Sequence, residues 1–355
     1  MLRIERIRKN KLFMTFILFT LISSLIFGCT DFDHDPENAI HTEGESLSVH
    51  FIDVGQGDCT LFVTPKGKTI LIDAGEKSAS DMIINYIRGQ GIHKIDVIIA
   101  THPHADHIGG MEDVIRAFDI GQIYMPRVMH TTQTFENLLL AIQEKGLKVK
   151  TAKAGVAFDI DPDIEAVMLA PNSEEYENLN DYSAVLKVTH GKNSFLITGD
   201  VEETSEKEML ASGYDLSADV LKVAHHGSSS STTDEFLDAV NPDHAVILLG
   251  KDNDYGHPHR ETIEKLRERG IPIYRTDELG NIVLTSDGQV IIFHHPSSQA
   301  KAASQIETIY IGNKKSQVFH LQNCSSLPSE HNQLKFYSRQ EAVGAGYSPC
   351  GRCNP

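Results

Sequence analysis

Three histidines and an aspartate stand within six residues of one another, directly after an apolar segment of the chain. The segment is 95–101, and the polar residues after it are His102, His104, Asp106 and His107. They cannot all lie on one face of a strand, because successive side chains of a strand point to opposite faces. In a loop they can surround one or two cations, and imidazole together with carboxylate suits zinc, manganese or iron. The sequence therefore predicts a metal site, and the alternative is a run of surface histidines.

Two later apolar runs end in residues of the same kind. Residues 195–198 lead to Asp200, and residues 220–224 lead to the adjacent His225 and His226. Catalytic side chains collect in loops that follow strands, because the sheet holds the start of the loop in place. We therefore expect these residues in the same site as the first cluster.

Short β-rich runs alternate with helix-like runs through most of the chain, a pattern that predicts an α/β fold with two mixed sheets packed face to face and helices outside. Strands are expected at 47–54, 60–64, 69–73, 95–101, 164–169, 184–189, 194–198, 220–224, 245–249, 282–285 and 290–293. Helices are expected at 80–89, 110–118, 133–144, 201–211, 234–239 and 260–269. We assign 47–295 to one domain, 296–306 to a small, polar linker, and 307–355 to a separate module.

The first 28 residues have the organisation of an export signal. A basic start precedes an apolar run at 12–27, which is shorter than the roughly 20 residues that a spanning helix needs. The run ends in Ile-Phe-Gly-Cys, which resembles the lipobox of bacterial lipoproteins and implies a signal peptide at 1–28 and lipidation of Cys29. An acidic spacer at 29–46 would follow. The alternative is an uncleaved anchor, and in both cases the chain is exported and tethered to a membrane.

Charge is distributed unevenly along the chain. The formal net charge is −17, although residues 1–28 and 297–355 both carry more basic than acidic side chains. The intervening body is therefore strongly acidic and repels polyanions at long range. This argues against broad, sequence-independent binding of nucleic acid by the large domain.

Several motifs together resemble a known family. The order H-x-H-x-D-H, Gly-Asp after a strand, and His-His-Gly-Ser after a later strand resembles the metallo-β-lactamase superfamily. More narrowly, five segments resemble the hydrolase-like domain of the competence proteins ComEC/Rec2: 51–58, 72–75, 180–183, 225–228 and 255–259. The resemblance covers about residues 47 to 294 and implies the metallo-β-lactamase fold, an αββα four-layer sandwich.

The same resemblance implies a site for two divalent metals, zinc or manganese. Its ligands would be His102 and His104 for one metal, Asp106 and His107 for the other, Asp200 bridging both, and one of His225 and His226 completing the second. Asp73 would orient the loop at 102–107, which we call the histidine loop, through hydrogen bonds. The histidine that the superfamily usually places between the loop and the bridging aspartate is absent, and His190 is the only candidate for it.

The catalytic residues implied by this family are Asp106, Asp200 and His257. Two metals would activate a hydroxide as nucleophile and neutralise charge on a phosphoryl oxygen. His257 would protonate the leaving oxygen, because imidazole exchanges protons near neutral pH. Alternatively, His257 is a structural residue of the turn at 255–259.

The C-terminal module carries its own candidate metal site. His320 and Cys324 are four residues apart, and Cys350 and Cys353 form a C-x-x-C pair, which together give the spacing of a structural zinc site. A segment this short needs such a metal to fold, and we expect a zinc-stapled α+β module. Its sequence resembles the zinc-binding domain of the Ada DNA-repair protein. His320 stands where that family has its methyl-accepting cysteine, so methyl transfer is not expected. The alternative is a free, reactive C-x-x-C.

Three functions are consistent with these features. The first is a nuclease or phosphodiesterase acting on DNA, because both family resemblances point to DNA as partner. The second is a phosphodiesterase or esterase acting on envelope polymers or small molecules, which the acidic body favours. The third is a non-catalytic lipoprotein that binds DNA or wall polymer, which the intact His/Asp cluster disfavours.

Overall fold

The computed structural model describes residues 46–294, 309–321, 324–336 and 339–353. The predicted signal peptide at 1–28, Cys29, residues 29–45 of the predicted spacer and the linker at 296–306 lie outside the described residues. Within the described part, no helix has the length and apolar character needed to cross a bilayer.

The first sheet of the large domain has eight strands within residues 46–294, in the order β14-β13-β1-β2-β3-β4-β5-β6. Their bounds are β1 (Leu47–Phe51), β2 (Thr60–Val63), β3 (Thr69–Ile72), β4 (Lys94–Ile99), β5 (Asp119–Met125), β6 (Val149–Thr151), β13 (Ile282–Ser286) and β14 (Ile291–Phe293). Strands β14 to β3 pair antiparallel, whereas β3 to β6 pair in parallel. Parallel neighbours need crossover connections. Helices α2 (Ser80–Gly89), α4 (Met111–Ala117) and α5 (Gln133–Glu144) lie in these connections.

The second sheet has six strands within the same residues, in the order β12-β11-β10-β9-β8-β7. Their bounds are β7 (Ile164–Ala170), β8 (Val185–His190), β9 (Asn193–Ile197), β10 (Val220–Lys222), β11 (His244–Ile247) and β12 (Ile273–Arg275). Strands β9 to β12 are parallel. Their crossovers contain helices α6 (Glu203–Ala211), α7 (Asp234–Val240) and α8 (Arg260–Glu268).

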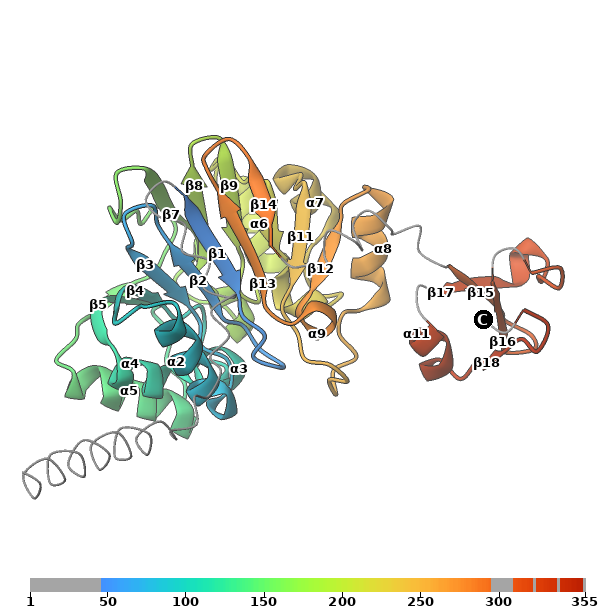
Figure 1. Ribbon diagram of the computed structural model, residues 1–355, viewed down its shortest axis with the longest axis horizontal. Coiled ribbons are helices and arrows are strands. Elements are labelled where there is room, and N and C mark those ends of the chain that lie inside the picture. The colour runs from blue at the N-terminus through green and yellow to red at the C-terminus, as the bar shows by residue number, and fades with distance from the viewer. Residues whose placement is uncertain (1–45, 295–308, 322–323, 337–338, 354–355) are drawn as a thin grey trace, which may run out of the picture. The chain divides into compact units, whose positions relative to one another are not determined.

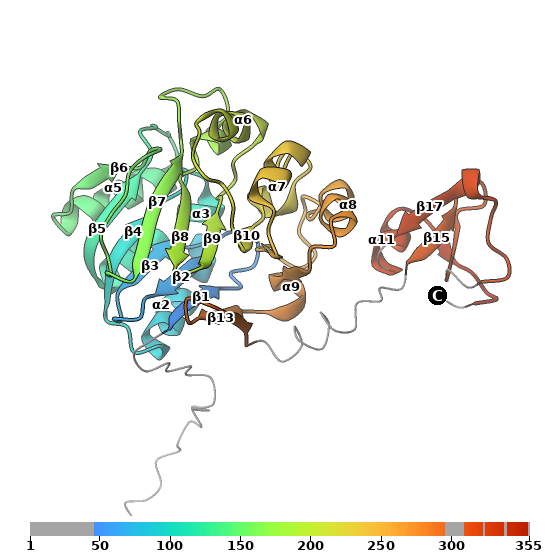
Figure 2. The same cartoon turned by 90° about the horizontal axis from the view of Figure 1, so that it is seen from above.

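Three apolar clusters hold these layers together. The central one joins the facing sides of the two sheets, where the Phe62 and Phe195 rings meet edge to face at 6.1 Å. A second cluster lies between the first sheet and α2, α4 and α5, and a third between the second sheet and α6, α7 and α8. Figures 1 and 2 show the two sheets with these helices on their outer sides. The predicted αββα sandwich is therefore confirmed.

Strand ends bring the candidate site together. In the parallel parts of each sheet the strands point the same way, so the loops that follow them meet at one edge. Asp73 follows β3, the histidine loop follows β4, Asp200 follows β9 and His225 follows β10. The short helix α3 (Ala105–Ile108) begins inside the histidine loop.

The C-terminal module is a separate, small sheet in the order β17-β15-β16-β18. Its elements are β15 (Tyr310–Asn313), β16 (Val318–Leu321), η5 (Glu330–Asn332), β17 (Gln333–Phe336), α11 (Arg339–Gly344) and β18 (Ser348–Pro349). Among the described residues, the apolar core of the module consists of Phe319, Phe336 and Ala342, with partly buried rings around them. A core of this size supplies little folding energy by itself.

Candidate metal centre

Asp73 fixes the histidine loop through contacts with Thr101 and His107. Its Oδ1 accepts the Thr101 backbone N–H at 2.8 Å, and its Oδ2 accepts the Thr101 hydroxyl at 2.6 Å. The same Oδ2 lies 2.7 Å from Nδ1 of His107. Because Nδ1 is engaged in this way, Nε2 of His107 is the nitrogen left to face the site.

Four of the predicted ligands converge from three loops. The candidate donor atoms of Asp106, His107, Asp200 and His226 all lie within 4.8 Å of one another. His107 Nε2 is 3.1 Å from Asp200 Oδ2. His226 Nε2 is 3.2 Å from Asp106 Oδ2 and 3.4 Å from Asp200 Oδ2. We call these four residues the ligand cluster.

The ligand cluster fits a divalent cation. His107 Nε2 and Asp200 Oδ1 are buried without a hydrogen-bond partner, although both are polar. Burial disfavours protonation of His107 and His226, but the neighbouring carboxylates, Asp200 foremost, outweigh it and raise the pKa of both imidazoles well above the usual value. The site therefore has a strongly negative potential. Two imidazoles with two carboxylates form a donor set suited to zinc or manganese.

His102 and His104 form a second, smaller group beside the ligand cluster. His102 Nε2 and His104 Nδ1 are 2.9 Å apart. Among the described residues these two histidines are not part of any set of three candidate donors within 4.8 Å. Ser183 Oγ instead contacts His102 Nδ1 at 3.2 Å. His190 lies at the other end of β8 and contacts Ser286 Oγ at 3.1 Å, so it is outside the site.

The paired histidines point in different directions. His225 and His226 both have a positive φ, 50° and 51°, which is unfavourable for side-chain-bearing residues. His226 enters the ligand cluster, and its Nδ1 lies 2.9 Å from the Leu248 carbonyl oxygen. His225 turns its Nδ1 toward Glu202, whose Oε1 is 3.1 Å away, while its Nε2 lies 3.9 Å from Asp200 Oδ2. The sequence left this choice open, because it depends on two local backbone angles.

Sequence reasoning missed a buried ion pair behind the ligand cluster. Lys222 is 0% exposed, and its ammonium group pairs with Asp58 and lies 3.7 Å from Asp200 Oδ1. It also donates to the Gly199 carbonyl at 2.8 Å. Burial opposes both charges, but Lys222 holds the pKa of Asp58 below its usual range. A lysine inside an apolar strand-like run was the available signal, since buried lysines are rare without a partner.

Glu202 was missed as well. It accepts hydrogen bonds from the side-chain amides of Asn178 at 2.8 Å and Asn180 at 2.9 Å. The hydrogen bond with His225 is the main cause of its lowered pKa. Asn180 therefore supports a carboxylate that borders the paired histidines.

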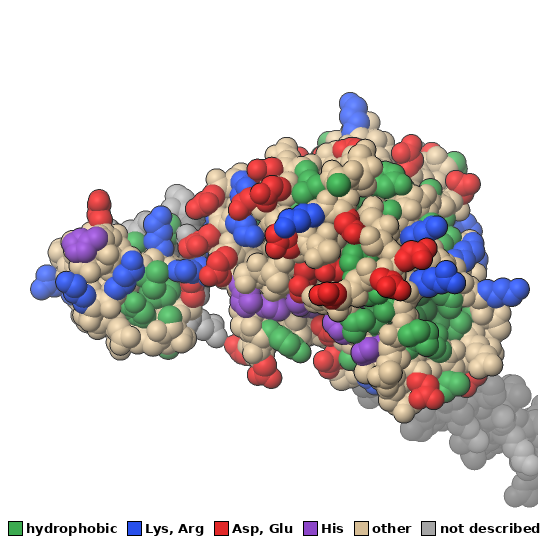
Figure 3. Space-filling view, turned by 180° about the vertical axis from the view of Figure 1, so that it is seen from behind, with side chains coloured by type: hydrophobic (Ala, Val, Ile, Leu, Met, Phe, Trp, Pro, Cys, Tyr) green, Lys and Arg blue, Asp and Glu red, His purple; other side chains and the backbone are tan. Residues whose placement is uncertain are grey.

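His257 lies beside the ligand cluster. Its ring centroid is 5.5 Å from that of His225 and 6.2 Å from that of His226. Burial, followed by the neighbouring histidines, lowers the pKa of His257 to about 4. Its imidazole is therefore neutral at pH 7. Figure 3 shows histidine side chains gathered on one face of the large domain.

Gly57 allows the loop between β1 and β2 to approach the backbone of Asp106 closely. Gly57 has φ 136°, and a Cβ at this position would collide with the carbonyl oxygen of Asp106. The next residue, Asp58, donates its backbone N–H to that same oxygen at 3.1 Å. The loop that carries Asp58 thus supports the backbone of Asp106 directly.

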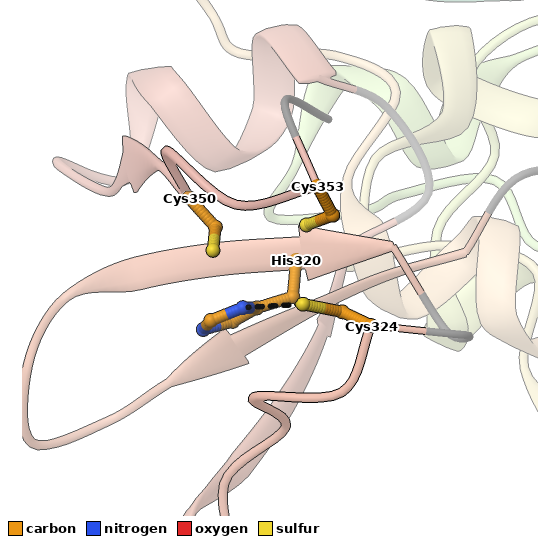
Figure 4. A group of neighbouring side chains, drawn as sticks. All are labelled: His320, Cys324, Cys350 and Cys353. Carbon is orange, nitrogen blue, oxygen red and sulfur yellow. Dashed lines mark hydrogen bonds between the residues drawn. The ribbon is translucent and has the colours of Figure 1, made fainter.

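The C-terminal module gathers all four of its predicted ligands. The donor atoms of His320, Cys324, Cys350 and Cys353 lie within 4.8 Å of one another. Figure 4 shows these four side chains gathered in one place. A hydrogen bond from the Ser326 backbone, ahead of the contact with His320, lowers the pKa of Cys324 to about 6. The Leu321 amide lies 3.4 Å from Cys353 Sγ. The lowered pKa favours the thiolate form that zinc binds at Cys324, whereas burial and the neighbouring thiols raise the pKa of Cys353.

Comparisons with known proteins agree with this architecture. The family model for the metallo-beta-lactamase superfamily matches residues 52–251, and that for the metal binding domain of Ada matches 294–355. ComE operon protein 3 of Bacillus subtilis is 32% identical over 260 residues, which are 68% of this chain and 33% of that protein. Recombination protein 2 of Haemophilus influenzae is 30% identical over 239 residues, which are 66% of this chain and 28% of that protein.

Among solved structures, the metallo-beta-lactamase fold protein YhfI of Bacillus subtilis aligns with a TM-score of 0.44 and 13% identity, covering 64% of this chain and 96% of that one. The chain spans about a third of the length of the curated relatives that it matches. The family models and the curated relatives confirm the resemblances inferred from the motifs. This chain belongs to the metallo-beta-lactamase superfamily, with homologues among the ComEC competence proteins, and carries an Ada-type metal-binding domain.

Proposed function

We propose that this protein is a metal-dependent phosphodiesterase that cleaves DNA. The observation that carries the proposal is the buried ligand cluster of Asp106, His107, Asp200 and His226, with its unpartnered donor atoms. Two homologues named a recombination protein and a competence protein support DNA as the substrate class. Divalent metals supply a nucleophile from water near neutral pH and neutralise charge on the phosphoryl group.

We further propose that the two metal positions differ in affinity. The ligand cluster offers four protein donors to one metal, with Asp200 shared between the positions. The other metal would have His102 and His104, which have no third candidate donor within 4.8 Å among the described residues. Fewer donors give weaker binding, and the second metal should exchange more readily.

The chain's own residues have distinct roles in this proposal. Lys222 and Asp58 hold Asp200 and His226 in place, since both contact members of the ligand cluster. Glu202 fixes the ring of His225. His257, with its low pKa, would donate a hydrogen bond to a substrate oxygen from a neutral imidazole, rather than act as a protonated acid.

The choice between the paired histidines is testable through metal content. His226→Gln should lose metal from the ligand cluster, whereas His225→Gln should keep it and lose turnover. Metal analysis after dialysis of both variants against metal-free buffer checks this prediction. Equal metal loss in the two variants would contradict the assignment of His226 as ligand.

A second candidate function is hydrolysis of phosphodiesters or esters in envelope polymers or small molecules. The strongly acidic composition of the body favours it, because such a body repels long nucleic acids. Whatever its substrate, we propose that the protein acts outside the cytoplasm and is anchored through a lipid on Cys29. Incorporation of labelled palmitate into the wild type, and its loss in Cys29→Ala, is the expected result.

The function is tested on residues 31–355 loaded with zinc or manganese. Single- and double-stranded DNA and bis(p-nitrophenyl) phosphate are the substrates, and Asp200→Asn is compared with Asp215→Asn, a change at an exposed carboxylate. Cleavage of DNA that is lost only in Asp200→Asn supports the nuclease. Turnover of the small diester with intact DNA favours the second candidate, and DNA cleavage by Asp200→Asn at the wild-type rate would refute the proposed site.

A further inference from the structure

We infer that Tyr255 is a stacking platform for the nucleobase next to the cleaved phosphodiester, so that the substrate is single-stranded DNA. The inference rests on the proposed nuclease function and adds a substrate class to it. Tyr255 is 66% exposed, although it is a large aromatic residue next to the site. Its ring stacks on that of His257, at 5.7 Å between centroids and 20° between planes.

The Tyr255 ring lies close to the ligand cluster. The His257 ring that supports Tyr255 is 6.2 Å from the ring of His226, a member of the ligand cluster. Tyr255 thus contacts His257, and His257 in turn borders the ligand cluster. A base attached to the sugar beside the cleaved phosphate could reach a ring at this position without reaching the metals.

Hydrogen bonds hold the backbone of His257, whose ring stacks on Tyr255, in place. The Asn253 side chain accepts the His257 backbone N–H at 3.0 Å and donates to the His257 carbonyl at 2.8 Å. It also donates to the Gly250 carbonyl at 3.0 Å. On the other side of His257, the ring of His259 packs edge to face at 4.7 Å, and the Ser229 amide donates to its Nδ1 at 2.9 Å. Tyr255 therefore stacks on a ring whose position is fixed, and this contact lowers the entropy that the tyrosine loses when a ligand stacks on its other face.

The charge of the domain explains why stacking is needed. A nuclease normally gains affinity from basic side chains along the phosphate backbone. This body is strongly acidic in composition, so contacts that do not depend on charge contribute a larger share of its affinity for DNA. Stacking of a base on an aromatic ring is such a contact, and it tolerates any base. In a duplex both faces of a base are already covered, and only an unpaired base can use Tyr255.

The test compares Tyr255→Leu with Tyr255→Phe, which keeps the ring. Tyr214→Leu serves as the matched control, because Tyr214 is also exposed but lies in the connection to the amino end of β10, away from the site. The substrates are a single-stranded 20-mer, its duplex, and the same strand with abasic positions. Oligonucleotide binding is also measured by fluorescence anisotropy in an Asp200→Asn background without chelator, so that the result does not depend on turnover and the C-terminal module keeps its metal.

We expect Tyr255→Leu to lower kcat/KM on the single strand about ten-fold, mainly through KM, and to weaken binding in the Asp200→Asn background by a similar factor. Tyr255→Phe and Tyr214→Leu should resemble the wild type. The abasic strand should be a poorer substrate, and the difference between wild type and Tyr255→Leu should largely disappear on it. Equal losses on normal and abasic strands, or a wild-type preference for duplex, would overturn the inference while leaving the nuclease intact. Absence of metal-dependent DNA cleavage by the wild type would overturn both.

Discussion

Lys222 places a fixed positive charge behind a site rich in carboxylates. Its ammonium group is buried and pairs with Asp58, which depends on it for charge compensation, and it lies 3.7 Å from Asp200, whose charge is compensated mainly by His107 and His226. Asp58, Asp73 and Asp200 are all buried around this position, and without a cation their mutual repulsion would open the site. A lysine supplies this charge before any metal binds, which lets the loops assemble in the metal-free chain.

The first prediction concerns this lysine. Lys222→Met should lower the free energy of unfolding by about 3–5 kcal/mol, because it leaves a buried carboxylate unpaired. The double variant Lys222→Met/Asp58→Asn should recover part of that loss, since it removes the orphaned charge. Urea denaturation in metal-free buffer measures both. A single variant with the wild-type midpoint would show that the pair does not carry the charge balance.

A second residue-scale prediction concerns pH. His50 on β1 is buried, with Nδ1 at 2.8 Å from the Tyr86 hydroxyl and Nε2 at 3.1 Å from Ser48 Oγ. Burial, together with His294, lowers the pKa of His50 from 6.5 to about 4. The folded state therefore resists protonation. The stability that depends on neutral His50 is complete above pH 6.5 and is lost progressively as the pH falls toward 4.

The loss of stability at low pH is checked by comparing urea denaturation of wild type and His50→Gln at pH 7.5 and pH 5, in metal-free buffer. A tenfold difference in proton affinity between the folded and unfolded states corresponds to about 1.4 kcal/mol. Between these two pH values the wild type should lose about 2 kcal/mol more than the variant. Parallel pH profiles for the two proteins would contradict a neutral, buried imidazole at this position.

At the residue scale, local sequence order predicted most of the candidate site. His102, His104, Asp106 and His107 could be found because they are neighbours in one loop. Asp58 and Lys222 come from distant segments, and their pairing appears only when two sheets are packed together. The different contacts of His225 and His226 depend on the positive φ angles of both residues. The pattern of side chains in the sequence does not predict these strained angles.

At the element scale, apolar runs predicted the central strands and the crossover helices. The bounds of α2 and α5 match the prediction, and at the start of α5 the Thr132 side chain accepts the Phe135 N–H, as an N-cap does. The strands β5, β6 and β12 were not predicted. All three residues of β6 are exposed, and β12 is only partly buried. Strands β6 and β12 form because a neighbouring strand offers backbone hydrogen bonds, and they carry little hydrophobic pattern of their own. Strand β5 is different, because its last three residues are buried and only its first four residues are fully or partly exposed.

The loop between β1 and β2 gives the third prediction. Gly57→Ala should displace the backbone of Asp106, because the added Cβ would collide with its carbonyl oxygen. Activity and metal affinity should both fall at least ten-fold, since Asp106 belongs to the ligand cluster. The matched control is Gly55→Ala in the same loop, where φ is also positive at 75° but nothing lies within 4 Å of the added Cβ.

Gly55→Ala should cost about 1–2 kcal/mol of stability from backbone strain and leave metal affinity unchanged. Calorimetric titration of zinc into both variants separates the two effects. If both variants bound zinc equally well, the close approach of Gly57 would have no role in shaping the site.

At the scale of the whole molecule, the chain joins two units that are stabilised in different ways. The large domain has three apolar clusters that span its layers and needs no metal to hold its sheets together. The module at 309–353 has a core of three fully buried side chains, within the part that the structure describes, and a four-donor metal cluster. The two units should therefore respond differently to the removal of metal.

Chelation gives the last prediction. Treatment with a strong zinc chelator should unfold the module, because the binding free energy of a structural zinc, about 10 kcal/mol or more, is also its folding free energy. Limited proteolysis should then cut within 309–353 and leave a stable fragment of the large domain. Cys350→Ser should be cut in the same way without chelator, while Cys59→Ala, which changes a buried thiol in the large domain, should not. A module that stays resistant to protease after its zinc is removed would mean that the three apolar side chains suffice for folding, and the metal would then serve binding rather than structure.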